Sequence, residues 1–436
     1  MSASDESRGG SSRSVGASAL VRFATFPITA LATLATTSLV IGYTGSVGYA
    51  AIAVISTIVQ MLPFADLGIG AGVINAVSEA PPNGDERQRA FASGFRILLI
   101  SGVTVAILGV VVACTVTWPT LLSVSDSGLD GLNAATVLVV LLLSLSIPLG
   151  VGQRVLTGLL RNPLVVGINS LLPIISLAAT ASVVILSLPP ALLAAAPALG
   201  QVMSAAVATI LASRSIAFRW SSLLHRREFR FPGLLRTGAW YLVVSITATL
   251  IYQFGRVLLA SRTDLQVVAE YSIVLQLYTP IWSFFAVSGA ALWPIFARHR
   301  ASGSSSRSLT LRMITLFGLA GVVCLVGLML WGGWFTAWLS HSKIHVSVSV
   351  LAACGIMIIV QAVQLVLGVF LTSDSGLRFQ ALWGIPLSMS VLAGIWIAAP
   401  YGGAAVPFIA TAIGVTIFRI APNSARVWRD LQRPSE

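Results

Sequence analysis

The sequence predicts an all-α polytopic membrane protein of about twelve transmembrane helices, and three observations support this class. Of its 436 residues, 56% are apolar and 9% are charged, against roughly 45–50% and about 25% in soluble domains. Its mean hydropathy is +0.91. The apolar residues come in runs of about twenty, the length with which an α-helix crosses the hydrocarbon core of a bilayer. These values exclude a soluble enzyme, a sizeable extramembrane domain and a nucleic-acid binder.

Charged residues, prolines and glycines bound the apolar runs and place twelve helices. The second and the eighth are longer than a bilayer requires, and each contains a proline, Pro63 or Pro280, that can bend it. The predicted spans are residues 23–43, 48–78, 97–117, 134–153, 164–187, 191–212, 238–260, 267–296, 313–336, 347–372, 381–399 and 403–421.

These spans predict two pseudo-symmetric six-helix lobes around a central cavity, over residues 18–212 and 238–422. Two repeated halves around a central site are a common transporter plan. Residues 1–17 are polar and rich in Gly and Ser, which predicts a disordered cytoplasmic tail, and residues 423–436 form a second cytoplasmic tail. The basic cytoplasmic linker over residues 213–237 is either a solvated tether or an amphipathic segment on the inner membrane surface.

The basic residues predict the orientation, because positively charged loops stay in the cytoplasm. With the N-terminus inside, the inner segments hold 23 of the 26 Lys and Arg residues. The outer loops hold Arg262 and Lys343, and Arg256 alone lies within a span. This split supports an even number of spans with both termini inside. The expected location is the inner or plasma membrane of a bacterial type of cell.

The loops do not favour catalysis, so we expect no enzyme activity, no catalytic residue, no metal and no cofactor. The three cysteines lie far apart within apolar runs and have no metal-ligand spacing. The four histidines lie in linkers or at loop edges. The sequence contains no P-loop, G-x-S-x-G or H-E-x-x-H motif.

Arg256 is the leading candidate for binding a substrate. Placing an ionisable side chain inside a membrane costs free energy, so such residues usually have a function. At regular helical spacing Ser245, Thr249, Tyr252 and Arg256 stack on one face, with Gln253 beside them. Such a stripe implies a hydrated cavity, and the planar fork of Arg suits phosphate or carboxylate. The alternative is an Arg that extends to the outer interface.

Hydroxyl groups and two acids complete the candidate set. Thr29 and Thr33 belong to a stripe of threonines on the first helix, which either lines the same cavity or bonds to its own helix. Asp66 follows Pro63 and is either a helix cap or the partner of an ion or a cavity arginine. Glu270 follows a capping-box pattern at Thr263 and has the same two interpretations.

Several of these stretches resemble one family. Asp66-Leu67-Gly68, Tyr252 through Arg256, Ala269-Glu270-Tyr271, Leu292-Trp293-Pro294 and Pro400-Tyr401-Gly402-Gly403 are similar to the polysaccharide-exporter, O-antigen flippase-like branch of the multidrug/oligosaccharidyl-lipid/polysaccharide (MOP) superfamily. The resemblance implies a V-shaped cavity lined by the first, second, seventh and eighth helices. It also implies an isoprenoid-diphosphate glycan as cargo, with Arg256 as the cavity cation and Asp66 and Glu270 as weaker matches. The chain departs from the family in having one clear intramembrane arginine.

The leading hypothesis is therefore a transporter that flips a lipid-linked oligosaccharide or polysaccharide precursor from the inner to the outer leaflet by alternating access. Its partners would be the lipid-linked glycan, membrane lipids and glycosyltransferases or a polymerase of the same pathway. One alternative is a multidrug/toxin cation antiporter of the same superfamily, although residues 23–43 hold no acid. The other is a non-transporting partner of a glycan-assembly complex.

Overall fold

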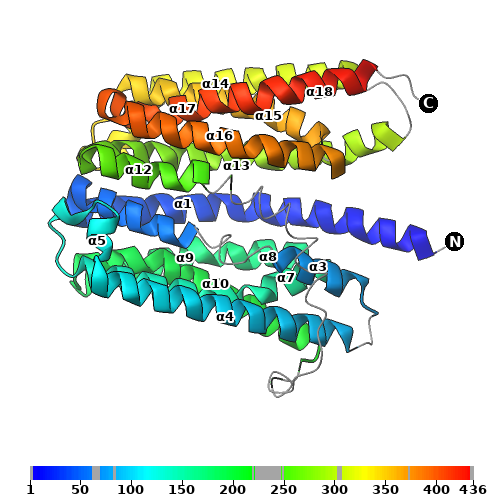
Figure 1. Cartoon of the computed structure of the whole chain (residues 1–436), viewed down its shortest axis with the longest axis horizontal. Helices are drawn as coiled ribbons and strands as arrows, with labels where there is room; N and C mark the ends of the chain where they lie inside the picture. The colour runs from blue at the N-terminus through cyan, green and yellow to red at the C-terminus, as the bar shows by residue number, and fades with distance from the viewer. Residues whose placement is uncertain are drawn as a thin grey trace. The chain divides into compact units, whose positions relative to one another are not determined.

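The computed structural model describes residues 3–60, 69–81, 85–218, 220, 247, 250–301, 307–371 and 374–432. Within these ranges the regular structure is helical, with no strand (Figure 1). The chain divides into two compact units. One unit consists of Met1–Thr44 and Ile52–Leu242, and the other consists of Gly45–Ala51 and Val243–Glu436.

The first unit is helical, and α6 with α7 and α8 with α9 each form one continuous segment of spanning length. The helix α1 begins at Ala3, but side chains are described only from Val21 onward. The side chains of the predicted tail 1–17 therefore lie outside the described part of the chain. Most of the predicted linker, residues 221–237, lies outside the described residues. The elements are α1 (Ala3–Gln60), α3 (Ile69–Glu79), α4 (Glu86–Thr115), α5 (Trp118–Leu121), η1 (Ser125–Ser127), α6 (Leu132–Leu149), α7 (Val151–Gly158), α8 (Asn162–Asn169), α9 (Leu171–Ile185), η2 (Pro190–Ala195) and α10 (Ala196–Ser215).

Gly45 separates two helical segments within α1. Its φ of 74° and ψ of −174° lie in a region that essentially only glycine enters, because a β-carbon would be strained there. The short segment after it, Gly45–Ala51, belongs to the second unit. In that unit the hydroxyl of Ser46 donates a hydrogen bond of 2.7 Å to Oε1 of Gln266. Gly45 therefore ends the first predicted span and directs the chain into the other unit.

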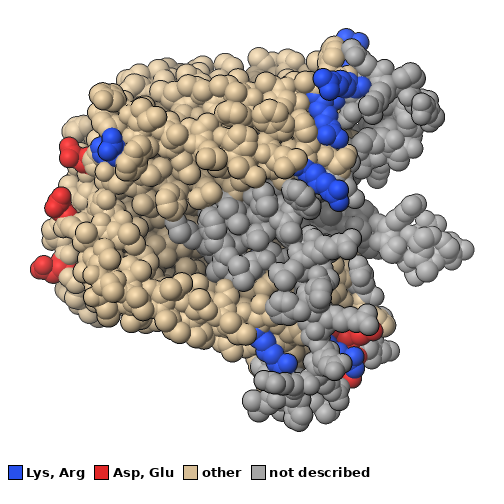
Figure 2. All heavy atoms as spheres, in the orientation of Figure 1, with Lys and Arg blue, Asp and Glu red and all other residues tan. Residues whose placement is uncertain are grey.

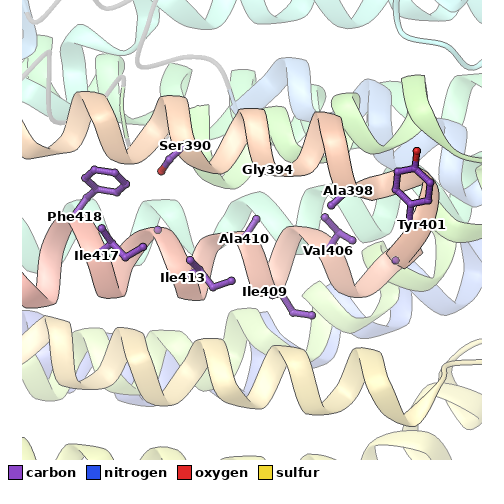
Figure 3. A pocket seen from close by; sticks show the side chains of 12 residues that line it. Ser390, Gly394, Ala398, Tyr401, Val406, Ile409, Ala410, Ile413, Ile417 and Phe418 are labelled. Atoms are coloured by element: carbon purple, nitrogen blue, oxygen red, sulfur yellow. The ribbon is translucent and has the colours of Figure 1, made fainter.

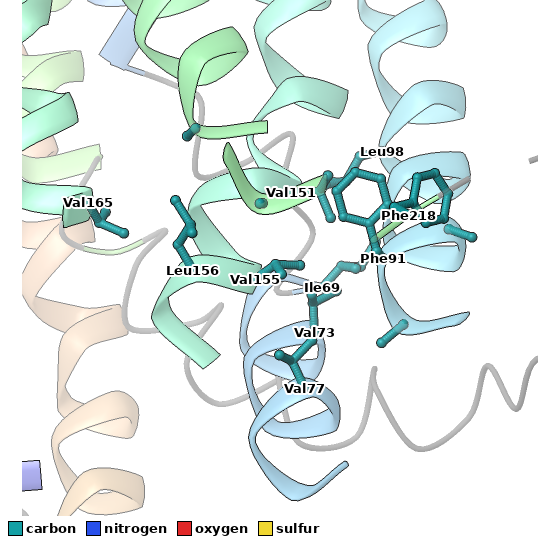
Figure 4. Packing of buried hydrophobic residues seen from close by; sticks show 14 of the residues in the cluster. Ile69, Val73, Val77, Phe91, Leu98, Val151, Val155, Leu156, Val165 and Phe218 are labelled. Atoms are coloured by element: carbon teal, nitrogen blue, oxygen red, sulfur yellow. The ribbon is translucent and has the colours of Figure 1, made fainter. Parts of the chain in front are cut away.

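The first unit has an apolar core that joins α3, α4, α7 and α8 (Figure 4). Val73 of α3, Phe91 of α4 and Val155 of α7 are fully buried there. Two glycines permit the close packing: a β-carbon on Gly94 would lie 2.7 Å from Val73, and one on Gly158 would lie 2.9 Å from Val77. This close packing supplies dispersion contacts between the helices. Such contacts stabilise helix association in a membrane, where the hydrophobic effect does not favour it because lipid tails are as apolar as the side chains.

The second unit is also helical. Its elements are η4 (Leu250–Phe254), α12 (Gly255–Arg262), α13 (Leu265–Ala301), α14 (Arg307–Leu339), α15 (Val348–Phe370), α16 (Asp374–Gly402), η5 (Gly403–Ala405), α17 (Val406–Val415), η6 (Thr416–Ile420) and α18 (Ala421–Gln432). Two of them, η4 and η6, are single π-helical turns, a wider helix that is frequent at functional sites. The last span continues through η6 into α18, so the helix extends into the predicted tail 423–436.

The outward faces of the helices are apolar, as a surrounding of lipid requires. Eight helical segments among the described residues are long and apolar enough to cross a membrane. Two of these, Ala24–Gln60 and Arg378–Arg429, take in parts of two predicted spans each. In α4 and α14 only 17% of the most apolar window is buried within the protein. Large side chains such as Val323 and Leu330 are exposed, which identifies a multi-pass integral membrane protein.

Charged side chains gather at the ends of the helices (Figure 2). In the second unit Arg307, Arg378 and Arg429 lie at the end where α14 and α16 begin and α18 ends, whereas Arg262 and Lys343 lie at the opposite end. This uneven distribution matches the pattern that predicts both termini inside, and the orientation remains a prediction.

Candidate functional site

Arg256 lies in the second unit, directly after a π-helical turn. The turn η4 covers Leu250–Phe254, and α12 begins at Gly255. Gly255 is buried, and a β-carbon on it would lie 3.2 Å from Ile395 of α16 and 4.0 Å from the hydroxyl of Tyr271. Glycine thus lets α12 approach its neighbours closely. Arg256, the next residue, is half-buried and its Nε atom is buried.

Tyr49 lies near Arg256 and also near Gln276. Tyr49 comes from the segment after Gly45 and is 4% exposed. Its hydroxyl lies beside the amide of Gln276 on α13 and within the electrostatic influence of Arg256. The phenol of Tyr49 therefore has a guanidinium from α12 and an amide from α13 in its surroundings. This group offers a positive charge with neutral hydrogen-bonding neighbours, which suits an anion.

The other residues of the predicted stripe are described only in part. Gln253 is half-buried in η4. The side chain of Tyr252 and the residues Thr249, Ser245 and Asp66 lie outside the described residues. The stripe was predicted from regular α-helical spacing, which does not hold through η4, because a π-turn bonds residues five apart.

The threonines of α1 belong to the first unit and bond to their own helix. The hydroxyl of Thr29 donates to the carbonyl of Phe26 at 2.9 Å, and that of Thr33 donates to the carbonyl of Thr29 at 2.8 Å. Thr25 and Thr36 do the same. Both Thr29 and Thr33 remain half-buried. With the proton engaged in this way, each oxygen can still accept a hydrogen bond, for example from a sugar hydroxyl.

Glu270 lies early in α13 and binds the start of another helix. Its Oε1 accepts a hydrogen bond of 2.7 Å from the backbone N–H of Ser347 and one of 2.8 Å from its hydroxyl. Ser347 is the residue before α15, which begins at Val348. A carboxylate is favoured at this position because the first N–H groups of a helix carry partial positive charge.

We expect the variant Glu270→Ala to lower the free energy of unfolding by about 0.5–2 kcal/mol, the usual cost of losing a helix cap. Thermal unfolding of the purified protein in detergent would measure the change. Asp130→Ala, which removes an exposed acid from the loop before α6, is the matched control and should change stability little. Unchanged stability together with lost transport would instead place Glu270 in ion or substrate binding.

Arg419 is a residue whose environment the sequence did not reveal. Arg419 is one of the 23 basic residues assigned to the inner side, at the end of the last predicted span. The structure places it in the π-turn η6, half-buried, with Nη1 donating a hydrogen bond of 3.3 Å to Oε1 of Gln380. Arg419 lies 16 residues after Gly403, the start of the last predicted span 403–421. This separation indicates that Arg419 falls within the span.

An apolar groove of about 460 Å³ lies between α16 and α17 (Figure 3). Small residues at Gly394, Ala398 and Ala410 leave space between the two helices. Ser390 and Tyr401 are the polar side chains of its lining. A groove of this composition is unsuited to a charged head group, so it is distinct from the Arg256 site.

Among the described residues no group of three or more His, Cys, Asp or Glu could hold a metal.

Apolar outer faces, helices of spanning length and terminal clusters of arginine define a helical multi-pass membrane protein with polar groups at bilayer depth. The chain belongs to the polysaccharide biosynthesis protein family, whose model matches residues 13–300. No curated protein sequence matches it.

Solved structures of the MOP superfamily share the fold. An inward-facing multidrug resistance MATE family transporter matches over 96% of this chain and 100% of its own, with a TM-score of 0.67. The lipid II flippase MurJ, in an inward closed conformation, matches over 94% and 87% with a TM-score of 0.74. A MOP superfamily transporter from Pyrococcus furiosus matches over 97% of both chains with a TM-score of 0.58. Each is 14% identical to this chain, a level that establishes the fold alone.

Proposed function

We propose that this protein flips a lipid-linked oligosaccharide or polysaccharide precursor, of the O-antigen type, from the inner to the outer leaflet. Membership of the polysaccharide biosynthesis family supports a glycan pathway. The shared fold includes a structure titled as a lipid II flippase, which supports lipid-linked cargo. The observation that carries the proposal is the half-buried Arg256 near Tyr49, whose hydroxyl also lies near Gln276.

The chemistry of the cargo explains why these groups are useful. A glycan attached to an isoprenoid diphosphate cannot cross hydrocarbon by itself, because its phosphates and hydroxyls would lose their hydrogen bonds to water. Arg256 can bind a phosphate through two parallel N–H donors and keeps its charge at every physiological pH. Gln276, Gln253 and the threonine oxygens Thr29 and Thr33 can exchange hydrogen bonds with sugar hydroxyls.

Alternating access between the two helical units would move the cargo. The sequence has no ATPase motif, and transport would be driven by an ion gradient or by synthesis and removal of the glycan on the two sides of the membrane. Glycosyltransferases and a polymerase of the same pathway would be its partners, and the inner or plasma membrane its location.

The multidrug antiporter is the second candidate function, because a MATE transporter shares the fold. A cationic drug needs acidic partners at its binding site, whereas the group around Arg256 is basic and would repel it. Purified protein in proteoliposomes separates the two functions. Flipping of a fluorescent lipid-linked glycan, detected by its accessibility at the second leaflet, supports the proposal. Transport of a cationic dye without glycan flipping favours the antiporter. If the protein transports neither the glycan nor the dye, the remaining hypothesis is a non-transporting partner of a glycan-assembly complex.

A further inference from the structure

The groove between α16 and α17 is formed by small residues on both helices. Gly394 and Ala398 of α16 and Ala410 and Gly414 of α17 line it. A β-carbon on Gly394 would lie 3.4 Å from the β-carbon of Ala410, and one on Gly414 would lie 2.7 Å from Val391 of α16. The two helices therefore pack closely along this line, and the short side chains leave about 460 Å³ open beside it. This volume lies in the range of roughly 300–1,000 Å³ that ligand pockets commonly have.

The groove opens to the hydrocarbon of the bilayer. It lies within the stretch Arg378–Arg429, which is long and apolar enough to cross a membrane. Three lining isoleucines of α17, Ile409, Ile413 and Ile417, follow one another at intervals of four residues and so share one face of the helix. They are 45%, 55% and 53% exposed, respectively. Apolar side chains exposed along a spanning helix contact lipid, so hydrocarbon fills this groove and not water.

The groove is apolar along its length and polar at one end. Ser390, one of the two polar side chains in its lining, donates its hydroxyl proton to the carbonyl of Leu387 at 2.9 Å. The other is Tyr401, which lies at the end of the groove opposite to Phe418 (Figure 3) and is 91% exposed. In the predicted orientation this is the outer end of α16, where a tyrosine lies at the level of the lipid head groups.

We propose that this groove binds one acyl chain of a phospholipid of the outer leaflet, with the phospholipid head group at the level of Tyr401. The eleven residues from Ser390 to Tyr401 extend over about 16 Å at about 1.5 Å per residue. This length is about half of a hydrocarbon core of roughly 30 Å, which is the depth of one leaflet. A chain that lies in the groove contacts both helices and supplies the dispersion contacts that the small lining residues do not make with each other.

A phospholipid is the occupant that these observations favour, independently of the proposed function. Phospholipid is the most abundant lipid around the protein, so mass action keeps a site for its chain occupied. The lining contains no charged side chain, so the site selects a hydrocarbon chain and not a particular head group. The exposed face of α14 provides the contrast, because its Val323 and Leu330 project into the lipid and a chain there contacts a single helix.

Photolabelling of the protein in phosphatidylcholine nanodiscs tests the inference. A trace of the phosphatidylcholine carries a diazirine on one acyl chain, and peptide mass spectrometry locates the label after illumination. We expect the label to be concentrated in residues 390–418 relative to the exposed face of α14. Ala410→Leu extends a side chain into the groove and should lower this labelling at least about threefold, a modest factor because hydrocarbon surrounds the whole span. Gly333→Leu is the matched control, because it adds the same side chain to an exposed position near the outer end of α14, and it should leave the labelling of residues 390–418 unchanged.

The remaining outcomes are equally decisive. Phosphatidylglycerol with the same labelled chain should label residues 390–418 as strongly as phosphatidylcholine does. Equal labelling of α14 and of residues 390–418 in the wild type would overturn the site, and so would labelling that Ala410→Leu leaves unchanged. Displacement of the label by farnesyl diphosphate at an equal concentration would assign the groove to an isoprenoid tail and overturn the phospholipid. If Ala410→Leu does not fold, Ala398→Leu decides by the same criterion.

Discussion

Replacing Arg256 with glutamine should reduce the flipping of a lipid-linked glycan by at least tenfold. A hydrogen bond to a charged group contributes about 1.5–3 kcal/mol, which corresponds to roughly tenfold to more than a hundredfold at about 1.4 kcal/mol per factor of ten. Glutamine keeps much of the side-chain length and polarity and removes the charge. The initial rate of flipping in proteoliposomes, at equal protein content, measures the effect.

Two further variants make this test specific. Arg256→Lys should retain part of the activity, because it keeps the charge but loses bidentate geometry. Arg262→Gln is the control, since Arg262 is exposed, donates to the carbonyl of Trp396 at 3.1 Å and lies over its ring. Normal flipping by Arg256→Gln would remove the site from the mechanism. Loss in both Arg256→Gln and Arg262→Gln would indicate a general effect of outer charge.

Replacing Gly152 with valine should destabilise the first unit more than other single substitutions considered for this protein. A β-carbon at Gly152 of α7 would lie 2.6 Å from the carbonyl carbon of Ala208 and would also meet the backbone of Thr209 on α10. Backbone atoms cannot move aside as a flexible side chain can, so the two helices must separate. Overpacking costs about 1–3 kcal/mol and occasionally more, and we expect the upper end. The apparent unfolding temperature in detergent measures it.

Gly333→Ala provides the comparison for this substitution. Gly333 lies exposed in α14, and a β-carbon there would meet nothing within 4 Å. Alanine should be neutral or stabilising by about 0.5–1 kcal/mol, because it restricts the unfolded chain and favours the helix. If Gly152→Val were as stable as Gly333→Ala, the close approach of α7 and α10 would be wrong.

The spans were predictable because a bilayer imposes a simple condition on composition. Runs such as residues 313–336 and 347–372 must be apolar around most of their circumference, and α14 and α15 occupy them with small shifts. Arg256 was predictable as a candidate for the same reason, because an isolated charge in such a run stands out. Its neighbour Tyr49 was not predictable, since it comes from a segment more than 200 residues away along the chain.

Local sequence also failed to indicate where the helices are irregular. The turns η4 and η6 have no proline, and their residues are ordinary helix or membrane residues. A π-turn persists where the surrounding packing holds an extra residue in place, which is a property of the neighbours. For this reason the stripe predicted on a regular helix did not take the π-turn over Leu250–Phe254 into account.

By itself the sequence determined that this chain is a helical membrane protein, and it predicted the spans and the basic end of each, because hydropathy and charge act on each segment separately. The tertiary structure alone decided the rest: that Glu270 binds the start of α15, that Tyr49 joins Arg256, and that Arg419 lies inside a unit beside Gly384 and not at a helix end. These outcomes depend on contacts between helices, and such contacts arise from side-chain shape across segments that no local pattern relates.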